Sequence, residues 1–311
     1  MTFSKIVFIV NPHAGNGSTG SDWPIIEALA RDRLGSFETH MTGGPGDAAD
    51  FARDAVEKGA GLVICVGGDG TLNEVVNGVM AHNESVRSGL VLGFVPDGTG
   101  CDFVKTVSIP RDLERSIDLI AAKTVRSIDV GRLRFRDHTG AESRRFFLNI
   151  ASFGLGGEVV EKVNRTTKAF GPFISFLWAT LISIFQYGKK KIHLKIDDDF
   201  EEELFIWHAA VSNGQYQGGG MWVAPDALVD DGLFDITVVG DLSLTEVFLN
   251  LPKLYNGTIK DIAKVVTRVG KKVEGVSDQR VLLDVDGEQP GELPVVIDII
   301  PGAVNIIAEQ D

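Results

Sequence analysis

A chain of 311 residues is longer than most single domains, and an apolar fraction of 44% can supply a core for each of two domains. The formal net charge of −13 argues against a protein that binds nucleic acid through phosphate contacts, and against docking on anionic lipid except through a local basic patch. The two cysteines form no disulfide framework or zinc motif and no signal peptide is recognisable, so we expect a cytoplasmic protein.

The first 131 residues alternate predicted strands with predicted helices. Strands are predicted at residues 5–10, 37–41, 62–66 and 90–95. Helices are predicted after the first strand and at residues 47–58, 71–82 and 112–123. The first helix is expected to begin at Asp22, with Pro24 in its first turn. This alternation is typical of a three-layer α/β domain, here residues 1–131, around a doubly wound parallel sheet.

After Gly131 the regular helical pattern ends. Short β-prone runs follow at residues 132–136, 146–152, 191–196, 204–212, 233–239, 281–286 and 295–300. One inserted helix should begin at Ser243, because Glu246 completes a capping box. We predict an antiparallel β-sandwich domain over residues 132–298, a nucleotide cleft between the two domains, and a C-terminal tail, residues 299–311, that can return to the first domain.

Glycine-rich loops follow all four N-terminal strands and should meet at the carboxyl edge of one sheet, where such sheets bind ligands. They span residues 11–17, 42–47, 67–74 and 96–103. Glycine lets backbone approach a phosphate closely, and the next helix N-terminus offers free N–H groups. Residues 15–20 also match the G-x-G-x-x-G motif, but weakly, because they do not follow the strand directly. Asp69 indicates either a Mg²⁺-nucleotide site or a structural hydrogen bond.

Taken in order, the motifs resemble those of the diacylglycerol kinase catalytic-domain family, which includes bacterial lipid kinases and sphingosine kinases, over nearly the whole chain. The Gly-Gly-Asp-Gly motif alone is shared with NAD kinases and phosphofructokinases. The ordered set that carries the resemblance comprises Asn11 to Gly15, residues 67–74, Asn77-Gly78, Gly98-Thr99 with Asp102-Phe103, residues 129–131, 225–227 with 230–232, and 286–288.

The resemblance implies an ATP-dependent lipid kinase with Mg²⁺. The residues that it places around ATP are Asn11, Pro12, His13, Ala14, Gly15, Thr42, Gly67, Gly68, Asp69, Gly70, Thr71, Asn73, Glu74 and Thr99. It places the metal on the Asp231 carboxylate and on the backbone carbonyls of Leu228 and Leu233. Asp102 and Asp129 are similar to the family's acidic network around Asp69.

One residue departs from the family pattern. Cys101 stands where the family has asparagine, and a thiol is a weaker hydrogen-bonding group than an amide. We therefore expect altered local hydrogen bonds, with consequences for turnover or substrate preference but not for the fold.

Carboxylates cluster near the C-terminus. Strand alternation over residues 281–286 places Asp284 and Asp286 on one face, and Gly287 then allows a turn that presents Glu288. Neighbouring carboxylates raise one another's pKa, which suits a proton acceptor. The resemblance places the general base within residues 286–288, with Asp286 and Glu288 as alternatives, and we count Asp69 among the catalytic residues.

The predicted reaction transfers phosphoryl to a lipid hydroxyl, with diacylglycerol as leading acceptor and phosphatidic acid as product. The alternatives are a NAD kinase, disfavoured by the Asn-Pro loop and the C-terminal acidic motifs, and a non-catalytic nucleotide or lipid sensor. The uncharged segment 169–188, with Trp178 and Phe185, is expected as a helix at a membrane surface, followed by three lysines. Expected partners are a lipid substrate, a transient membrane surface and a second copy, but no nucleic acid.

Overall fold

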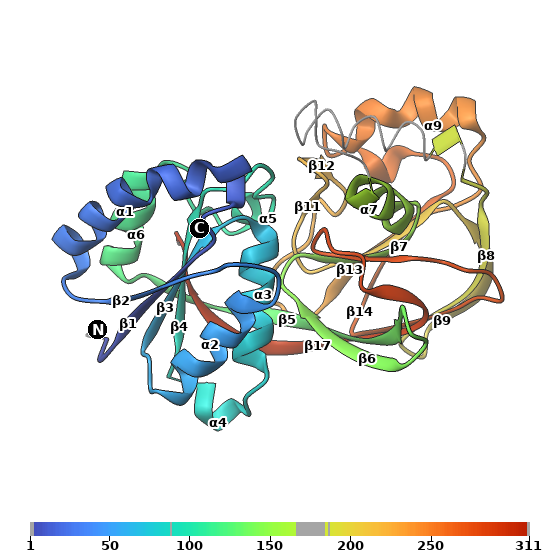
Figure 1. Ribbon diagram of the computed structural model, residues 1–311. Helices are drawn as coiled ribbons and strands as arrows, with labels where there is room; N and C mark the ends of the chain where they lie inside the picture. The colour runs from blue at the N-terminus through green and yellow to red at the C-terminus, as the bar shows by residue number, and fades with distance from the viewer. Residues whose placement is uncertain (1–2, 88, 166–183, 186, 310–311) are drawn as a thin grey trace. The chain divides into compact units, whose positions relative to one another are not determined.

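The computed structural model describes residues 3–87, 89–165, 184–185 and 187–309. The chain divides into two compact units, of which the first comprises Met1–Val130 with Pro301–Asp311 and the second Gly131–Ile300. Two long strands, β5 (Val125–Asp137) and β17 (Gly291–Ile307), run from one unit into the other. Figure 1 shows the elements of each unit.

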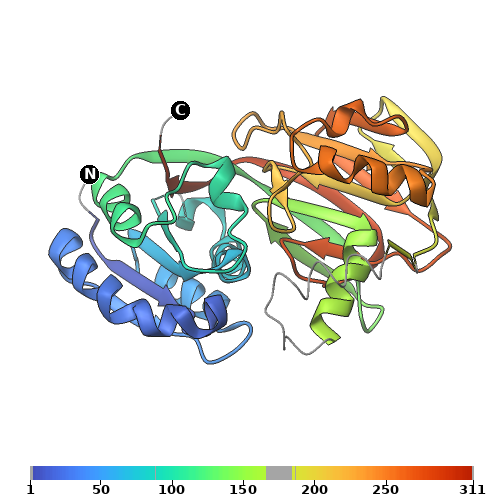
Figure 2. The same cartoon turned by 90° about the horizontal axis from the view of Figure 1, so that it is seen from above.

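A parallel sheet forms the centre of the first unit. Its strand order is β2 (Glu38–Met41), β1 (Ile6–Val10), β3 (Leu62–Gly67), β4 (Val91–Pro96) and the end of β17. β3 and β4 are buried along their whole length, as expected of parallel strands with both faces covered. The end of β17 lies beside β4, where Asn305 pairs with Val91 (Figure 2). The predicted α/β domain with a parallel sheet is confirmed.

Helices cover both faces of this sheet. In Figure 1, α1 (Ser18–Leu34) and α6 (Leu113–Ala122) lie along one side, and α2 (Asp47–Glu57) and α3 (Asp69–Met80) along the other. Two short helices complete this part, α4 (Glu84–Arg87) and α5 (Phe103–Thr106).

The predicted start of the first helix is wrong. α1 begins at Ser18 rather than at Asp22, and Pro24 lies inside the helix beyond its first turn. The physical reason is the backbone at Gly17, whose φ of +91° turns the chain directly into the helix. The side chain of Thr19 then fixes the first turn by donating to the Asp97 carbonyl oxygen at 2.7 Å.

Two antiparallel sheets form the second unit. One has the order β6 (Glu142–Phe147), β5, β17, β15 (Lys272–Val276), β8 (Lys190–Ile196) and β9 (Phe200–Ile206). The other has the order β14 (Val265–Gly270), β13 (Phe234–Val239), β10 (His208–Ser212), β7 (Ile150–Gly154) and β16 (Leu283–Val285). A small hairpin of β11 (Tyr216–Gln217) and β12 (Met221–Trp222) turns through three glycines.

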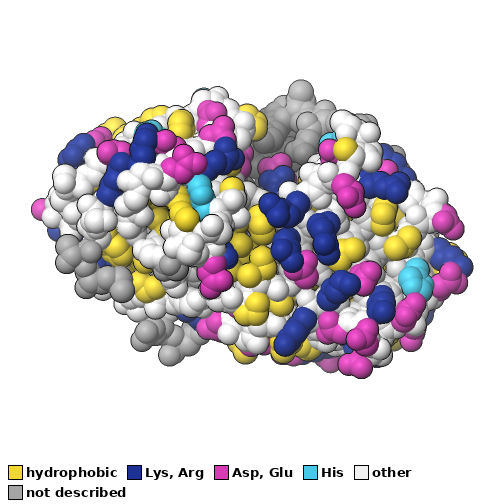
Figure 3. Space-filling model, turned by 90° about the horizontal axis from the view of Figure 1, so that it is seen from below, with side chains coloured by type: hydrophobic (Ala, Val, Ile, Leu, Met, Phe, Trp, Pro, Cys, Tyr) yellow, Lys and Arg dark blue, Asp and Glu magenta, His cyan; other side chains and the backbone are white. Residues whose placement is uncertain are grey.

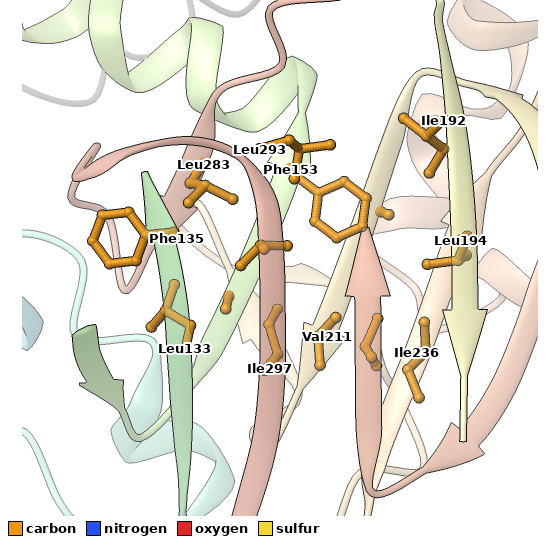
Figure 4. Close-up of a cluster of buried hydrophobic side chains, with 14 of the residues drawn as sticks. Leu133, Phe135, Phe153, Ile192, Leu194, Val211, Ile236, Leu283, Leu293 and Ile297 are labelled. Carbon is orange, nitrogen blue, oxygen red and sulfur yellow. The ribbon is translucent and has the colours of Figure 1, made fainter. Parts of the chain in front are cut away.

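Alternate residues of both sheets face one shared core. Figure 4 shows this cluster, in which Leu133 and Ile297 come from one sheet and Phe153, Val211 and Leu283 from the other. All five side chains are at most 1% exposed. The period-two burial along β17 and β8 is the pattern of a sandwich with one solvated face, so the predicted antiparallel β-rich unit is confirmed.

The predicted strand 204–212 is two strands in different sheets. β9 ends at Ile206 and β10 begins at His208, so the chain changes sheet at Trp207. The Trp207 N–H donates to Val239 O and its indole N–H to Leu242 O, each at 2.8 Å, which anchors the crossing point.

Helical segments complete the second unit: α7 (Leu155–Arg165), α9 (Leu244–Asn250), η2 (Leu251–Leu254) and η3 (Ile259–Asp261). The capping box of Ser243 and Glu246 is confirmed at the start of α9. Most of the expected membrane helix, including Trp178, lies outside the described residues. Phe185 is 66% exposed and its ring lies 5.3 Å from that of Phe248. In the part of the chain that the structure describes, no helix is long and apolar enough to cross a bilayer.

Candidate functional site

The first glycine loop is joined to the third. The Asn11 side-chain amide donates to Thr71 Oγ1 at 3.0 Å, and its carbonyl oxygen accepts from the His13 N–H at 3.0 Å. The chain then turns through Gly15 at a φ of +58°, where a Cβ would lie only 2.2 Å from Ser18 Oγ. Two carbonyls brace the turn, since Ala14 N donates to Asn11 O and Gly20 N to Pro12 O, each at 3.1 Å. The side chain of Asn11 therefore holds the first loop in place and joins it to Thr71 of the third loop.

The third and fourth loops interlock through backbone. The Asp97 N–H donates to Gly67 O at 2.8 Å, and a Cβ on Gly98 would lie 2.5 Å from the Gly68 Cα. A Cβ at that distance cannot be placed without moving backbone, so only glycine fits at position 98. α3 begins at Asp69, so its first N–H groups lie at the end of these loops. The result is a cradle of backbone with little side-chain bulk, which suits a phosphate.

Asp69 ties the two loops together. Its Oδ2 accepts the Asp102 N–H at 2.8 Å, and the Asp102 carboxylate in turn pairs with Lys105 at 2.7 Å. Asp69 thus has the structural hydrogen bond that was one of its two predicted roles. Asp129, the third member of the expected acidic network, accepts the N–H of Gly302 at 2.7 Å and holds the start of the returning C-terminal segment.

Cys101 occupies a tight turn of the fourth loop. Its φ is +49°, a left-handed conformation in which asparagine is more common than other non-glycine residues. The thiol is buried and lies 3.5 Å from Gly98 O, which also accepts a hydrogen bond from Arg111 at 2.7 Å. Burial raises the pKa of the Cys101 thiol to about 12, so it stays protonated and cannot act as a nucleophile at neutral pH.

The second loop is held by Glu74. The two oxygens of its carboxylate accept the N–H groups of Gly46 and Ala48 at 3.0 and 3.2 Å, at the N-terminus of α2. Thr42 is 6% exposed, and its own N–H donates to Val10 O at 2.9 Å. Glu74 therefore shapes this loop, and all four loops belong to one connected network in the first unit.

The remaining predicted nucleotide residues differ in exposure. Thr99 is exposed at the fourth loop and Gly70 is half-buried at the start of α3. Thr71 and Asn73 are 7% and 1% exposed, and Asn73 accepts hydrogen bonds from the Asn77 amide within α3. The structure therefore places Thr71 and Asn73 as internal supports of the loop.

The two candidate bases have opposite environments. The Asp286 carboxylate accepts three backbone N–H groups, those of Leu148 at 3.1 Å, Asn149 at 3.2 Å and Ile150 at 2.9 Å. Glu288, by contrast, is exposed, and its side chain makes no hydrogen bond to the residues that the structure describes. Asp286 is fixed in place, whereas Glu288 is able to reach a ligand.

Asp284 is a buried carboxylate that local sequence does not distinguish from its neighbours. It is 4% exposed, its Oδ1 accepts the Gly287 N–H at 3.0 Å, and its Oδ2 accepts the Gln217 amide at 2.6 Å. Its pKa rises to about 7, mainly because of burial and to a smaller extent because of Asp286. The expected repulsion from a neighbouring carboxylate therefore contributes to the shift, but burial contributes more. Gln217 and Ser152, which bond each other at 3.2 Å, are further polar residues that the sequence analysis missed.

The predicted metal residues lie on a surface turn. Asp231 is exposed and accepts the Leu233 N–H at 2.9 Å, while the Leu228 side chain is 52% exposed. Burial and the charge of Asp231 raise the pKa of the nearby Asp235 to about 6. Within the described ranges no three His, Cys, Asp or Glu side chains form a metal-binding group. The predicted site would not appear in such a search, because its ligands are one carboxylate, that of Asp231, and two backbone carbonyl oxygens.

Comparison with protein families gives two matches that together cover most of the chain. Residues 5–133 match the diacylglycerol kinase catalytic domain, and residues 149–308 match the YegS C-terminal NAD kinase beta sandwich-like domain.

Named relatives agree with these matches. The chain is 29% identical to a diacylglycerol kinase of Staphylococcus carnosus, over 92% of this chain and 89% of that protein. It is 30% identical to a protein of Xanthomonas axonopodis pv. citri named a probable lipid kinase YegS-like, over 94% and 93%. Among solved structures, a candidate diacylglycerol kinase of Bacillus anthracis superposes with a TM-score of 0.81 at 25% identity, covering 100% of this chain and 97% of that one.

Proposed function

We propose, from the premise that this chain belongs to the diacylglycerol kinase family, that it transfers the terminal phosphoryl group of ATP to the hydroxyl of a lipid. Diacylglycerol is the leading acceptor, because the relative from Staphylococcus carnosus is named a diacylglycerol kinase. The observation that carries the proposal is the interlocked backbone of the third and fourth loops, where a Cβ on Gly98 would lie 2.5 Å from Gly68.

The glycine cradle fits the phosphates of ATP. Gly67, Gly68 and Gly70 place backbone rather than side chains next to the N-terminus of α3, where N–H groups and the helix dipole favour an anion. Asp69 and Asn11 keep the loops together, and Thr99 is exposed beside them. When bound, ATP supplies the phosphoryl group, and these residues hold and orient it.

We assign the general base to Glu288. A base must approach the hydroxyl whose proton it accepts, and the Glu288 carboxylate is exposed and not engaged by described neighbours. Asp286 has both oxygens bound to backbone N–H groups, so we assign it the role of holding the turn that presents Glu288. Positioning dominates phosphoryl transfer, so both residues matter for turnover.

We further propose that Mg²⁺ binds at the turn of Asp231. Burial is the main cause of the raised pKa of Asp235, repulsion from Asp231 adds to it, and a cation beside Asp231 would offset that repulsion. Carbonyl oxygens are suitable further ligands for Mg²⁺, and those of Leu228 and Leu233 are the candidates. Bound there, the ion would stabilise this turn of the second unit.

The test is phosphorylation with radiolabelled ATP over a panel of lipid alcohols, with NAD as a separate acceptor. We expect label in a lipid, diacylglycerol first, and none in NAD. Label in NAD alone would replace the proposal with the NAD kinase alternative. No label in any acceptor, with ATP bound in calorimetry, would favour the non-catalytic sensor.

A further inference from the structure

Four arginines are concentrated on two neighbouring strands of the second unit, although the chain as a whole carries a net charge of −13. On β5, Arg132, Arg134 and Arg136 alternate with the buried Leu133 and Phe135, so the three arginines point to the solvated side of the sheet. Figure 3 views this side, and Lys and Arg side chains gather over the second unit beside exposed hydrophobic ones. The concentration of arginine is local and contrasts with the acidic whole.

The neighbouring strand adds a fourth arginine to this face. In the register of β5 and β6, Arg134 lies directly opposite Arg144, and Arg136 lies opposite Glu142. Like charges directly opposite each other destabilise an antiparallel pair, so Arg134 and Arg144 cost stability in this arrangement. An anion held between them would remove that cost. We call Arg132, Arg134, Arg136 and Arg144 the arginine face.

Most of these arginines form no close ion pair, although the charge of Arg134 adds to that of Lys272 in lowering the pKa of Glu274 on β15. Arg132 pairs with Asp298 on β17, at a shortest distance of 2.5 Å. Arg134, Arg136 and Arg144 are exposed and form no ion pair with any residue that the structure describes. Arg144 instead lies 5.4 Å over the ring of Phe146. By contrast, Lys191, Lys195 and Lys272 on the same sheet each lie within 4 Å of an acidic side chain.

The arginine face adjoins the segment that carries the proposed base. The ring of His138 lies 3.1 Å from Gln289 O, at the residue after Glu288. A Cβ on Gly291 would lie 2.0 Å from Arg136 O, so these backbones are in direct contact. An arginine at the end of β5 is therefore close to the turn that, on the proposed function, handles the lipid hydroxyl.

We propose that the arginine face binds the phosphate groups of an anionic lipid surface and so docks the second unit on the membrane that holds its acceptor. The guanidinium group suits this role because its fork of N–H donors matches phosphate oxygens. Arg132, Arg134 and Arg136 are spaced by roughly 6–7 Å along an extended strand, which allows contact with several headgroups. The proposal rests on the proposed function for its choice of a lipid surface over a phosphorylated protein.

The charge of the whole chain does not prevent this contact. At physiological salt the screening length is about 8 Å, so a surface senses the local arginines more than distant carboxylates. Each basic residue near an anionic membrane strengthens binding about fivefold, so the three arginines without a close ion pair together contribute about 100-fold.

The test is sedimentation with vesicles, without nucleotide. Vesicles of phosphatidylcholine alone are compared with equal mixtures of phosphatidylcholine and phosphatidylglycerol, at low and high salt. The variant combines Arg134→Gln, Arg136→Gln and Arg144→Gln. We expect the wild type to bind the mixed vesicles in a salt-sensitive way, and the variant about 100-fold more weakly.

A matched control variant removes three paired arginines of the first unit, by Arg31→Gln, Arg33→Gln and Arg53→Gln, and should bind like the wild type. An equal loss of vesicle binding in both variants, or no loss in the arginine-face variant, would overturn the proposal. So would a change of oligomeric state in the arginine-face variant without a change in vesicle binding, because the face would then contact a second copy.

A second measurement separates docking from catalysis. Phosphorylation of short-chain diacylglycerol dissolved as monomers should be unchanged in the arginine-face variant, while phosphorylation of diacylglycerol in mixed vesicles should fall with binding. Vesicle binding without any lipid phosphorylation would refute the proposed function and leave the docking surface standing. Arg144→Gln alone should keep or raise the melting temperature, because it relieves the repulsion from Arg134; a clear drop would indicate a structural role instead.

Discussion

Replacing Asp284 with asparagine should stabilise the second unit by an amount that grows with pH. Burial is the main reason why the pKa of Asp284 rises from 3.8 to about 7. Because the folded-state pKa is raised, the stability from the protonated carboxyl is fully present below pH 3.8 and is lost as the pH rises to about 7. A difference of about three pH units is equivalent to roughly 4 kcal/mol.

Asparagine resembles the protonated acid in shape and cannot ionise, so the Asp284→Asn variant should keep the stability that the wild type loses. For a unit of this size, 1 kcal/mol shifts the melting temperature by roughly 2–4 °C. Calorimetry across the pH range should therefore find the variant roughly 10 °C above the wild type once the pH exceeds about 7, and equal to it in acid. Asp199→Asn, at an exposed turn, serves as the control and should follow the wild type. Melting curves of wild type and Asp284→Asn that stay parallel at all pH values would refute the reasoning.

Three further predictions concern the proposed site. Glu288→Gln should lower turnover by about 10² with nearly unchanged ATP affinity, as expected for the loss of a general base. Asp286→Asn should also slow the reaction, because it releases the turn that presents Glu288. Wild-type rates for both variants would show that the general base lies outside this segment. Gly98→Ala should weaken ATP binding at least tenfold in calorimetry and destabilise the first unit by about 1–3 kcal/mol, because the new Cβ overlaps Gly68. The control is Gly89→Ala, where a Cβ would lie in open space. Equal ATP affinities of the two variants would contradict a phosphate-binding role of the glycine cradle. Added Mg²⁺ should raise the melting temperature of the wild type but not of Asp231→Ala, and an equal response of the two proteins would exclude Asp231 as a ligand.

Much of the first unit was predictable because its signals are local. Continuous apolar runs mark β3 and β4, and the glycines after each strand mark the loops. The start of α1 was missed because it depends on the left-handed backbone at Gly17, which helix-capping rules for Asp22 do not anticipate. Likewise, the hydrogen bonds that Glu74 accepts from Gly46 and Ala48 join distant residues, so local sequence does not reveal its part in shaping the second loop.

The second unit was less predictable because its contacts join distant parts of the chain. The break at Trp207 depends on hydrogen bonds to Val239 and Leu242, more than thirty residues away. The local sequence of Asp284 and Asp286 is similar, yet one carboxylate is buried against Gln217 and the other is held by the backbone of β7 and the residues before it. The two environments differ because the two carboxylates contact different parts of the chain. These contacts join residues far apart in the sequence, so the local sequence gives no sign of them.

The return of the chain in β17 has a consequence for synthesis on the ribosome. β4, with its apolar sequence from Val91 to Pro96, gains its outer neighbour only when Asn305 and Ile306 have been made. Until then, the nascent first unit carries an unpaired hydrophobic edge while some two hundred further residues are translated. An open edge of this kind is a template for pairing with other chains until β17 covers it. The order of translation thus leaves the first unit as the last part of the molecule to be completed.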